Sequence, residues 1–136
     1  ICFMEYVVNK HSKQNFYNEF KRWSNLHGFP IVSDLVLPEN VFVCYNKNDT
    51  PLYCVWLYLT DSRLAWVAFP MSNKDVPYNK RGNALEFLMN YVSEYAKKEG
   101  FVSLITTSNT IEVIDVLEKC DYKEADLNIN QYIKIL

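Results

Sequence analysis

The chain has little of what marks a metalloprotein or a membrane protein. It contains three glycines, two histidines and four cysteines in 136 residues, and no two cysteines form a C-x-x-C pair. Without further His or Cys at ligand spacing, no zinc site is indicated. No apolar run reaches the roughly 18 residues that a membrane-spanning helix needs, and no basic stretch leads into an apolar one as in a secretion leader. We therefore expect a soluble, cytoplasmic protein with no metal and no membrane partner.

An excess of charge of one sign is also missing. Fourteen Lys and Arg stand against sixteen Asp and Glu, for a formal net charge of -2, and the basic residues are spread rather than striped. Nucleic-acid-binding proteins usually carry a basic face. The aromatic residues of the strand-like segments are not interleaved with basic ones, as a platform for single strands would require. We expect no nucleic-acid partner.

The cysteines are widely spaced, which is typical of buried free thiols in a reducing compartment. Two of them, Cys44 and Cys54, flank a predicted hairpin turn at residues 46–50. They could therefore face each other across the hairpin as a structural thiol pair.

Apolar and aromatic residues are abundant instead. They make up 49% and 15% of the chain, which is typical of a packed interior rather than a disordered segment. The length fits one domain over residues 1–136. Oligomeric state is left open between monomer and homodimer.

The clearest periodic segment is residues 83–99, which we expect to form an amphipathic helix ended by Gly100. Free N–H groups of its first turn would lie beside Lys80 and Arg81, a combination that favours a bound anion. The apolar face consists of Leu85, Leu88, Met89, Val92, Tyr95 and Ala96.

Shorter patterns predict the remaining elements before this helix. Ser12 caps a predicted helix that reaches about residue 27, and residues 29–40 read as a loop with at most one helical turn. We expect strands at residues 5–8, 41–45, 52–59 and 63–69, the last three consecutive and antiparallel, with Pro70 ending the last and a polar loop over 71–78.

After the helix, residues 101–107 predict a strand parallel to 63–69, because a helix joins the two. Asn109 and Glu112 resemble a capping box for a further helix. Residues 131–136 read as a last strand, and a short one is expected near 124–127. The predicted order is β-α-β-β-β-α-β-α-β-β.

The loop before the central helix reads x-x-x-G-x-A from Asn79 to Ala84. It resembles the acyl-CoA-binding loop of the GNAT N-acetyltransferase superfamily, Gln/Arg-x-x-Gly-x-Gly/Ala, with Asn79 in place of Gln or Arg. The resemblance covers the last two thirds of the chain. Farther on, the family has the motif Tyr-Glu-Lys-x-Gly-Phe, and this chain has Leu-Glu-Lys-Cys-Asp-Tyr at residues 117–122. Leu117 therefore stands in place of the Tyr and Asp121 in place of the Gly.

The resemblance implies an α/β (α+β) fold of GNAT type. Its central sheet is mixed and mostly antiparallel, with one parallel pair at the coenzyme A site and helices on both faces. It also implies acetyl-CoA as co-substrate. The pyrophosphate would lie on the loop amides, and the pantetheine arm would lie between two splayed strands. The implied cofactor-binding residues are Val67, Ala68, Phe69, Asn79, Lys80, Arg81, Gly82, Asn83, Ala84 and Asn109.

In the implied reaction, a primary amine of a small molecule or a peptide attacks the thioester directly. It needs a base, an oxyanion donor and a proton donor for the thiolate. A strand amide near Phe69 could be the oxyanion donor. The Tyr that commonly protonates the thiolate is replaced by Leu117, and Cys120 and Tyr122 lie about a turn away. The base stays open among His27, Asp34, Asp61 and Asp75.

Other interpretations remain. The chain could be a catalytically silent domain of the same fold that binds coenzyme A or a protein, which Leu117 favours. It could also be an unrelated α/β module that binds another phosphate ligand, or the basic loop could be an ordinary solvated turn. Gly82 and Ala84 match the two small residues of the family's loop motif, which favours the view that the ligand site is kept.

Overall fold

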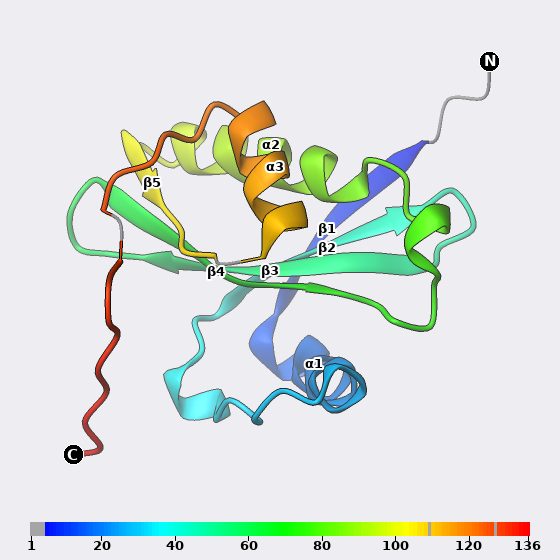
Figure 1. Ribbon diagram of the computed structural model, residues 1–136, viewed down its shortest axis with the longest axis horizontal. Helices are drawn as coiled ribbons and strands as arrows, with labels where there is room; N and C mark the ends of the chain where they lie inside the picture. The colour runs from blue at the N-terminus through cyan, green and yellow to red at the C-terminus, as the bar shows by residue number, and fades with distance from the viewer. Residues whose placement is uncertain (1–4, 109, 127) are drawn as a thin grey trace.

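The structure, a computed structural model, describes residues 5–108, 110–126 and 128–136. Five strands, three α-helices and two short 3-10 turns follow one another in these residues (Figure 1). In chain order they are β1 (Tyr6–Ser12), α1 (Lys13–His27), η1 (Asp34–Val36), β2 (Asn40–Asn46), β3 (Pro51–Leu59), β4 (Leu64–Ser72), η2 (Tyr78–Lys80), α2 (Ala84–Lys98), β5 (Ser103–Ile105) and α3 (Ile111–Lys119).

The strands form one sheet in the order β1-β2-β3-β4-β5. The first four are antiparallel to their neighbours, and β5 pairs with β4 in parallel. Helix α1 covers one face of the sheet, and α2 and α3 lie on the other (Figure 1). The predicted fold class is therefore confirmed, with a mixed, mostly antiparallel sheet, one parallel pair and helices on both faces.

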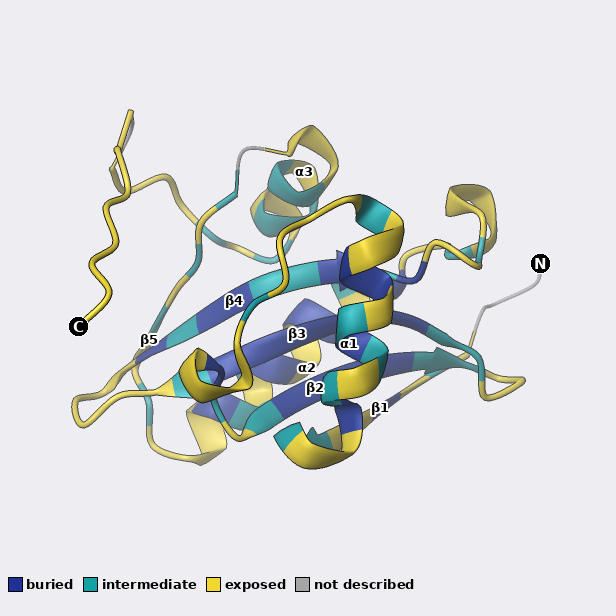
Figure 2. Cartoon of the chain, turned by 90° about the horizontal axis from the view of Figure 1, so that it is seen from below, coloured by how far each residue is buried: buried dark blue, intermediate teal, exposed yellow. Residues whose placement is uncertain are grey.

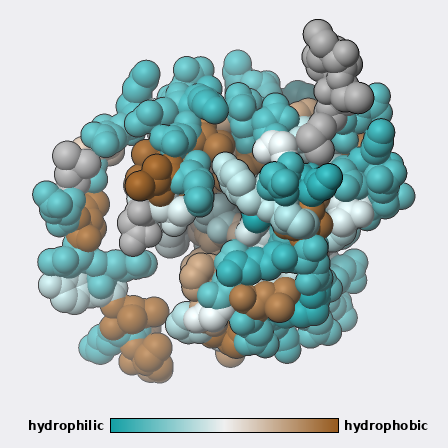
Figure 3. Space-filling view, turned by 45° about the vertical axis from the view of Figure 1, so that its right-hand side comes forward, coloured by the Kyte–Doolittle hydropathy of each residue, from teal (hydrophilic) through white to brown (hydrophobic). Residues whose placement is uncertain are grey.

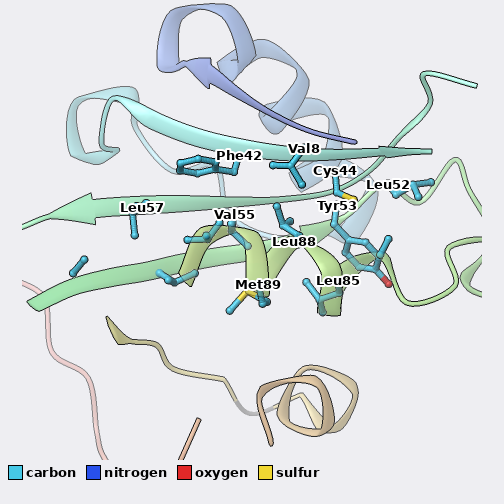
Figure 4. Packing of buried hydrophobic residues seen from close by; sticks show 14 residues of the cluster. Val8, Phe42, Cys44, Leu52, Tyr53, Val55, Leu57, Leu85, Leu88 and Met89 are labelled. Atoms are coloured by element: carbon cyan, nitrogen blue, oxygen red, sulfur yellow. The ribbon is translucent and has the colours of Figure 1, made fainter. Parts of the chain in front are cut away.

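Each face of the sheet has its own hydrophobic core. On the α2 face, Leu85, Leu88 and Met89 pack against side chains of β2, β3 and β4, as Figure 4 shows from close by. On the other face, α1 lies across the sheet, as Figure 2 shows. Phe20 and Trp23 of this helix are buried together with side chains of β2, β3 and β4. The helical periodicity of residues 83–99 therefore marks the side of α2 that meets the sheet.

Cys44 and Cys54 do not face each other, so the predicted thiol pair is wrong. In the antiparallel register of β2 and β3, Cys44 lies opposite Tyr53 and Cys54 lies opposite Val43. Side chains alternate between faces along a strand, and this offset of one residue puts Cys44 in the α2-face core and Cys54 in the α1-face core. Burial raises the pKa of the Cys44 thiol to about 12 and also raises that of Cys54.

Strand β4 continues past Pro70 to Ser72, so the proline does not end it as predicted. Trp56 pairs with Ala68 and Cys54 with Met71, which leaves two β4 residues opposite one β3 residue. This is a β-bulge, and its first residue, Phe69, has a φ of 52°. A bulge is a place where a strand tolerates proline, because the missing N–H costs no regular ladder bond.

Two further predictions about strands differ from the structure. Strand β5 spans Ser103–Ile105 rather than residues 101–107. The described part of residues 124–136 contains no strand, and residue 127 lies outside it. Ile133 and Ile135 are 87% and 85% exposed, so the apolar alternation of this segment is not matched by a neighbouring strand.

The face shown in Figure 3 is mostly hydrophilic, with apolar side chains in separate patches. Among the described residues, no helix combines the length and the hydropathy needed to cross a bilayer.

Candidate functional site

Strands β4 and β5, at one edge of the sheet, part after three paired residues. Their parallel pairing runs from Leu64 opposite Ser103 to Trp66 opposite Ile105, where β5 ends. Strand β4 continues for six more residues, to Ser72. A cavity of about 230 Å³ lies where they separate. Its described lining residues are Trp66, Ala68, Phe69, Pro70, Thr107, Ser108, Thr110, Val113 and Gln131.

The bulge at Phe69 lies three residues beyond the last β4–β5 pair, that of Trp66 with Ile105. An extra residue bends a strand and increases its local twist, which favours the separation of the two strands. Two of the predicted arm-binding residues, Ala68 and Phe69, line the cavity. The third, Val67, is fully buried in the α2-face core, so only its backbone could meet a ligand at the strand edge.

The predicted phosphate loop follows β4 and leads into α2. Asn79 and Lys80 lie in η2 and are exposed. Gly82 has a φ of 54°, a left-handed conformation that glycine adopts without a steric cost. Helix α2 begins at Ala84, which is fully buried. The loop therefore turns sharply at Gly82, while Ala84 holds the start of the helix against the core.

The Arg81 side chain points into the protein rather than out of the loop. Its Nε donates to the Val76 carbonyl oxygen at 3.1 Å, and its Nη1 donates to the Tyr53 hydroxyl at 3.1 Å. The guanidinium also lies over the rings of Tyr53 and Tyr78, 5.3 and 5.5 Å from their centroids. Of the two basic residues in the loop, Lys80 is the one with an exposed side chain.

Tyr6 of β1 contacts the loop from the other side. Its hydroxyl donates to the Arg81 carbonyl oxygen at 3.2 Å and accepts from the Asn83 N–H at 3.1 Å. Burial raises the pKa of this hydroxyl, so it keeps the proton that it donates. Sequence reasoning missed Tyr6 and Tyr53, because no local pattern links residues so far from the loop.

Several loop amides already have partners. Besides the Asn83 N–H, the Arg81 N–H donates to the Tyr78 carbonyl at 3.1 Å and the Ala84 N–H to the Arg81 carbonyl at 3.2 Å. The resemblance assigns the pyrophosphate to the four amides of residues 81–84, and three of these are thus hydrogen-bonded within the protein.

The other amides at this turn remain available. Within residues 5–108, 110–126 and 128–136, the N–H groups of Gly82, Leu85 and Glu86 have no hydrogen-bond partner. The last two belong to the first turn of α2, where the helix itself offers no acceptor. These three donors lie at the positive end of the helix dipole, a combination that favours an anion.

The candidate bases are not brought to the cavity. His27 Nε2 lies 2.8 Å from the Ser72 carbonyl oxygen, and its ring stacks on Phe29. Asp75 forms an ion pair with Arg22 at 2.8 Å. Asp34 lies in η1 and Asp61 in the turn between β3 and β4. None of the four candidate bases is among the described residues that line the β4–β5 cavity.

The candidate proton donors lie elsewhere too. Leu117 packs against the α2-face core. Cys120 and Tyr122 line a larger cavity of about 740 Å³ near the C-terminal end of α2. Burial raises the pKa of Cys120 to about 11 and that of Tyr122 to about 12.

Two predictions have no test in these residues. Asn109, expected to bind the pantetheine arm, lies outside the described residues. The expected capping box of Asn109 and Glu112 is wrong, because the N-cap of α3 is Thr110, whose side chain makes no capping hydrogen bond. In the part of the chain that is described, no group of three or more His, Cys, Asp or Glu side chains is arranged to hold a metal ion.

No protein-family model matches the sequence, and no curated protein matches it. Solved structures do match its fold. An aminoglycoside acetyltransferase from an uncultured soil metagenomic sample, in complex with sisomicin, superposes with a TM-score of 0.72 at 11% identity, over 96% of this chain and 97% of that one.

Two further structures agree. An aminoglycoside N-acetyltransferase in complex with CoA matches with a TM-score of 0.66 at 10% identity, over 98% of this chain and 97% of its own. Glucosamine-6-phosphate N-acetyltransferase from Arabidopsis thaliana matches with a TM-score of 0.65 at 10% identity, over 96% and 99%. The chain therefore has the GNAT acetyltransferase fold, as the loop resemblance predicted.

Proposed function

We propose that this protein is an acyl-CoA-dependent N-acyltransferase that moves an acetyl group from acetyl-CoA to a primary amine. The observation that carries the proposal is the parting of β4 and β5 beside a cavity, in a fold that also places a left-handed glycine, Gly82, just before the start of α2. Acetyl-CoA carries its diphosphate and its thioester on one flexible arm, so it needs one site for each: the Gly82 turn for the diphosphate and the β4–β5 opening for the arm.

The pyrophosphate would bind the N–H groups of Gly82, Leu85 and Glu86, which have no partner among the described residues. A side chain at Gly82 would crowd the phosphate. Lys80 would add positive charge from the loop, because its side chain is exposed there. Amides that already have partners, such as that of Asn83, could at most share their proton with the ligand.

The pantetheine arm would follow the free edge of β4 beside Ala68 and Phe69, and Asn109 is the further residue proposed to bind it. The acceptor nitrogen would attack the thioester carbonyl and form a C–N bond while the amine loses a proton. The C–S bond would break to release the coenzyme A thiolate, which takes up a proton. The developing oxyanion would be bound by a strand amide near Phe69. We assign no side chain as base or acid.

The acceptor is proposed to be an amine on a small molecule. Support comes from the solved structures of this fold, one of which is in complex with sisomicin and another of which is a glucosamine-6-phosphate N-acetyltransferase. A cytoplasmic location belongs to the same proposal, supported by the free thiols of Cys44, Cys54 and Cys120.

A catalytically silent domain that binds coenzyme A is the second candidate. It is favoured by Leu117, which packs into the core where the family commonly has a tyrosine. No described base candidate reaches the cavity either. Binding of coenzyme A is common to both candidates, and turnover separates them.

The first experiment is a thermal shift with acetyl-CoA on the wild type, Gly82→Glu and Gly100→Glu. Both glycines have a left-handed φ, 54° and 93°, so both substitutions strain the backbone. We expect the acetyl-CoA shift to vanish in Gly82→Glu and to persist in Gly100→Glu, where the added side chain meets open space. Absence of any shift in the wild type would overturn the proposal.

Turnover is then measured as thiol release from acetyl-CoA with a panel of amines that includes aminoglycosides and amino sugars. Release that depends on an amine supports the transferase. Acetyl-CoA binding without release from any amine favours the silent domain.

A further inference from the structure

Arg81 is the basic residue that stands immediately before Gly82, but its side chain does not face the expected phosphate. Its guanidinium has five N–H donors, and it uses two of its nitrogens on Val76 and Tyr53, inside the fold. The ring of Tyr53, a residue only 8% exposed, lies against it. Cations stack favourably on aromatic faces, so this arrangement holds the guanidinium under the loop.

Tyr6 acts on the same turn from β1. One hydroxyl contacts the carbonyl before Gly82, that of Arg81, and the N–H after it, that of Asn83. Binding both peptide groups that flank one residue restricts its two backbone angles. Tyr6 therefore holds Gly82 in its left-handed conformation, and this conformation sets the direction of the Gly82 N–H.

We propose that Tyr6, Arg81 and Tyr53 form a clamp that positions the Gly82 turn for the diphosphate of the acyl donor, with Arg81 a positioning residue rather than a phosphate ligand. This inference rests on the proposed function. The clamp ties the loop to β1 through Tyr6 and to β3 through Tyr53, two strands already fixed in the sheet. A loop held in its binding shape avoids the entropic cost of ordering when the ligand binds.

The clamp makes a specific demand on the ligand. It improves binding only of acyl donors that carry the diphosphate, because it acts through amides at the phosphate end of the site. An acyl donor without the diphosphate, S-acetyl-pantetheine, would use the β4 edge alone. A general loss of packing would instead weaken binding of both donors.

The test compares acetyl-CoA with S-acetyl-pantetheine on Tyr6→Phe and Tyr53→Phe. Tyr58→Phe is the matched control, because its hydroxyl also donates to a backbone carbonyl, that of Val36 at 2.8 Å, but far from the loop. Dissociation constants are measured by calorimetry, and KM and kcat where turnover occurs. Melting without ligand confirms that each variant folds.

We expect Tyr6→Phe and Tyr53→Phe each to raise the acetyl-CoA dissociation constant about three- to tenfold, the range for one lost hydrogen bond. The value for S-acetyl-pantetheine and kcat should stay at the wild-type level, as should all values for Tyr58→Phe. Arg81→Lys should weaken acetyl-CoA binding similarly, since Lys keeps the charge but not the fork that reaches Val76 and Tyr53.

Three results would overturn the clamp. They are equal losses for both donors, no loss for either, or wild-type acetyl-CoA affinity in Arg81→Lys. Each leaves the proposed function standing if the wild type binds acetyl-CoA. If the wild type does not bind it, the proposed function fails first, and the clamp has no diphosphate to serve.

Discussion

His11 and Tyr45 are joined by a hydrogen bond of 2.9 Å between Nε2 and the phenolic oxygen, on neighbouring strands β1 and β2. The His11 ring also stacks on Phe16 of α1. Burial lowers the pKa of His11 from 6.5. The neutral imidazole is thus favoured in the folded protein, although the side chain is only partly shielded from water.

This relationship predicts a stability that depends on pH. Above pH 6.5 His11 is neutral in both the folded and the unfolded chain, and its contribution is complete. As the pH falls below that value, the unfolded chain binds the proton first, so stability is lost. Urea unfolding of the wild type and of His11→Gln at pH 7.5 and 5.5 tests this. The loss between the two pH values should be smaller in His11→Gln, and equal losses would contradict the prediction.

The Leu88 side chain tests how strongly packing holds α2 against the sheet. The side chain is fully buried in the α2-face core. Leu88→Ala removes buried methyl groups and leaves a cavity, which typically costs about 2–5 kcal/mol. Val102→Ala is the control, since Val102 is 75% exposed. We expect the urea midpoint to fall markedly for Leu88→Ala and hardly at all for the control. Similar midpoints would mean that α2 is not packed as described.

Local patterns were enough to predict much of this fold. The apolar spacing over residues 83–99 predicted both α2 and the face that it buries, because helical period and burial are the same physical constraint. Gly100 was predicted to end this helix, and its φ of 93° is the left-handed conformation with which helices commonly end. The parallel β4–β5 pair followed from the helix that joins the two strands.

What depended on register or on distant contacts could not be predicted. The sequence places Cys44 and Cys54 on the two strands of a hairpin, but a one-residue offset in their register puts the two side chains on opposite faces of the sheet. The direction of Arg81 depends on Tyr53, a neighbour supplied by β3. Tyr6 meets the loop across 75 residues of sequence. No local pattern contains such information.

Lys80 predicts a salt-dependent contribution to acetyl-CoA binding. It is exposed in η2 next to the turn, so its charge acts through water and is screened by salt. Lys80→Ala should weaken binding about two- to fivefold at low ionic strength and less at 0.5 M salt. Lys74→Ala, also exposed but on the preceding loop, serves as control. A loss that is unchanged by salt, or shared by the control, would contradict a direct role in neutralising phosphate.

Thr107 tests the opening between the strands. It is exposed and lines the cavity of about 230 Å³, as Ala68 does, whereas its neighbour Thr106 is not among the lining residues. A tryptophan at position 107 would occupy much of the space that the pantetheine arm needs. Thr107→Trp should therefore weaken binding of acetyl-CoA and of S-acetyl-pantetheine alike, by fivefold or more, on the order of 1 kcal/mol. Thr106→Trp should bind both as the wild type does. If only the affinity for acetyl-CoA fell, the obstruction would lie at the phosphate end of the site. Equal affinities in both variants would mean that the arm follows another path.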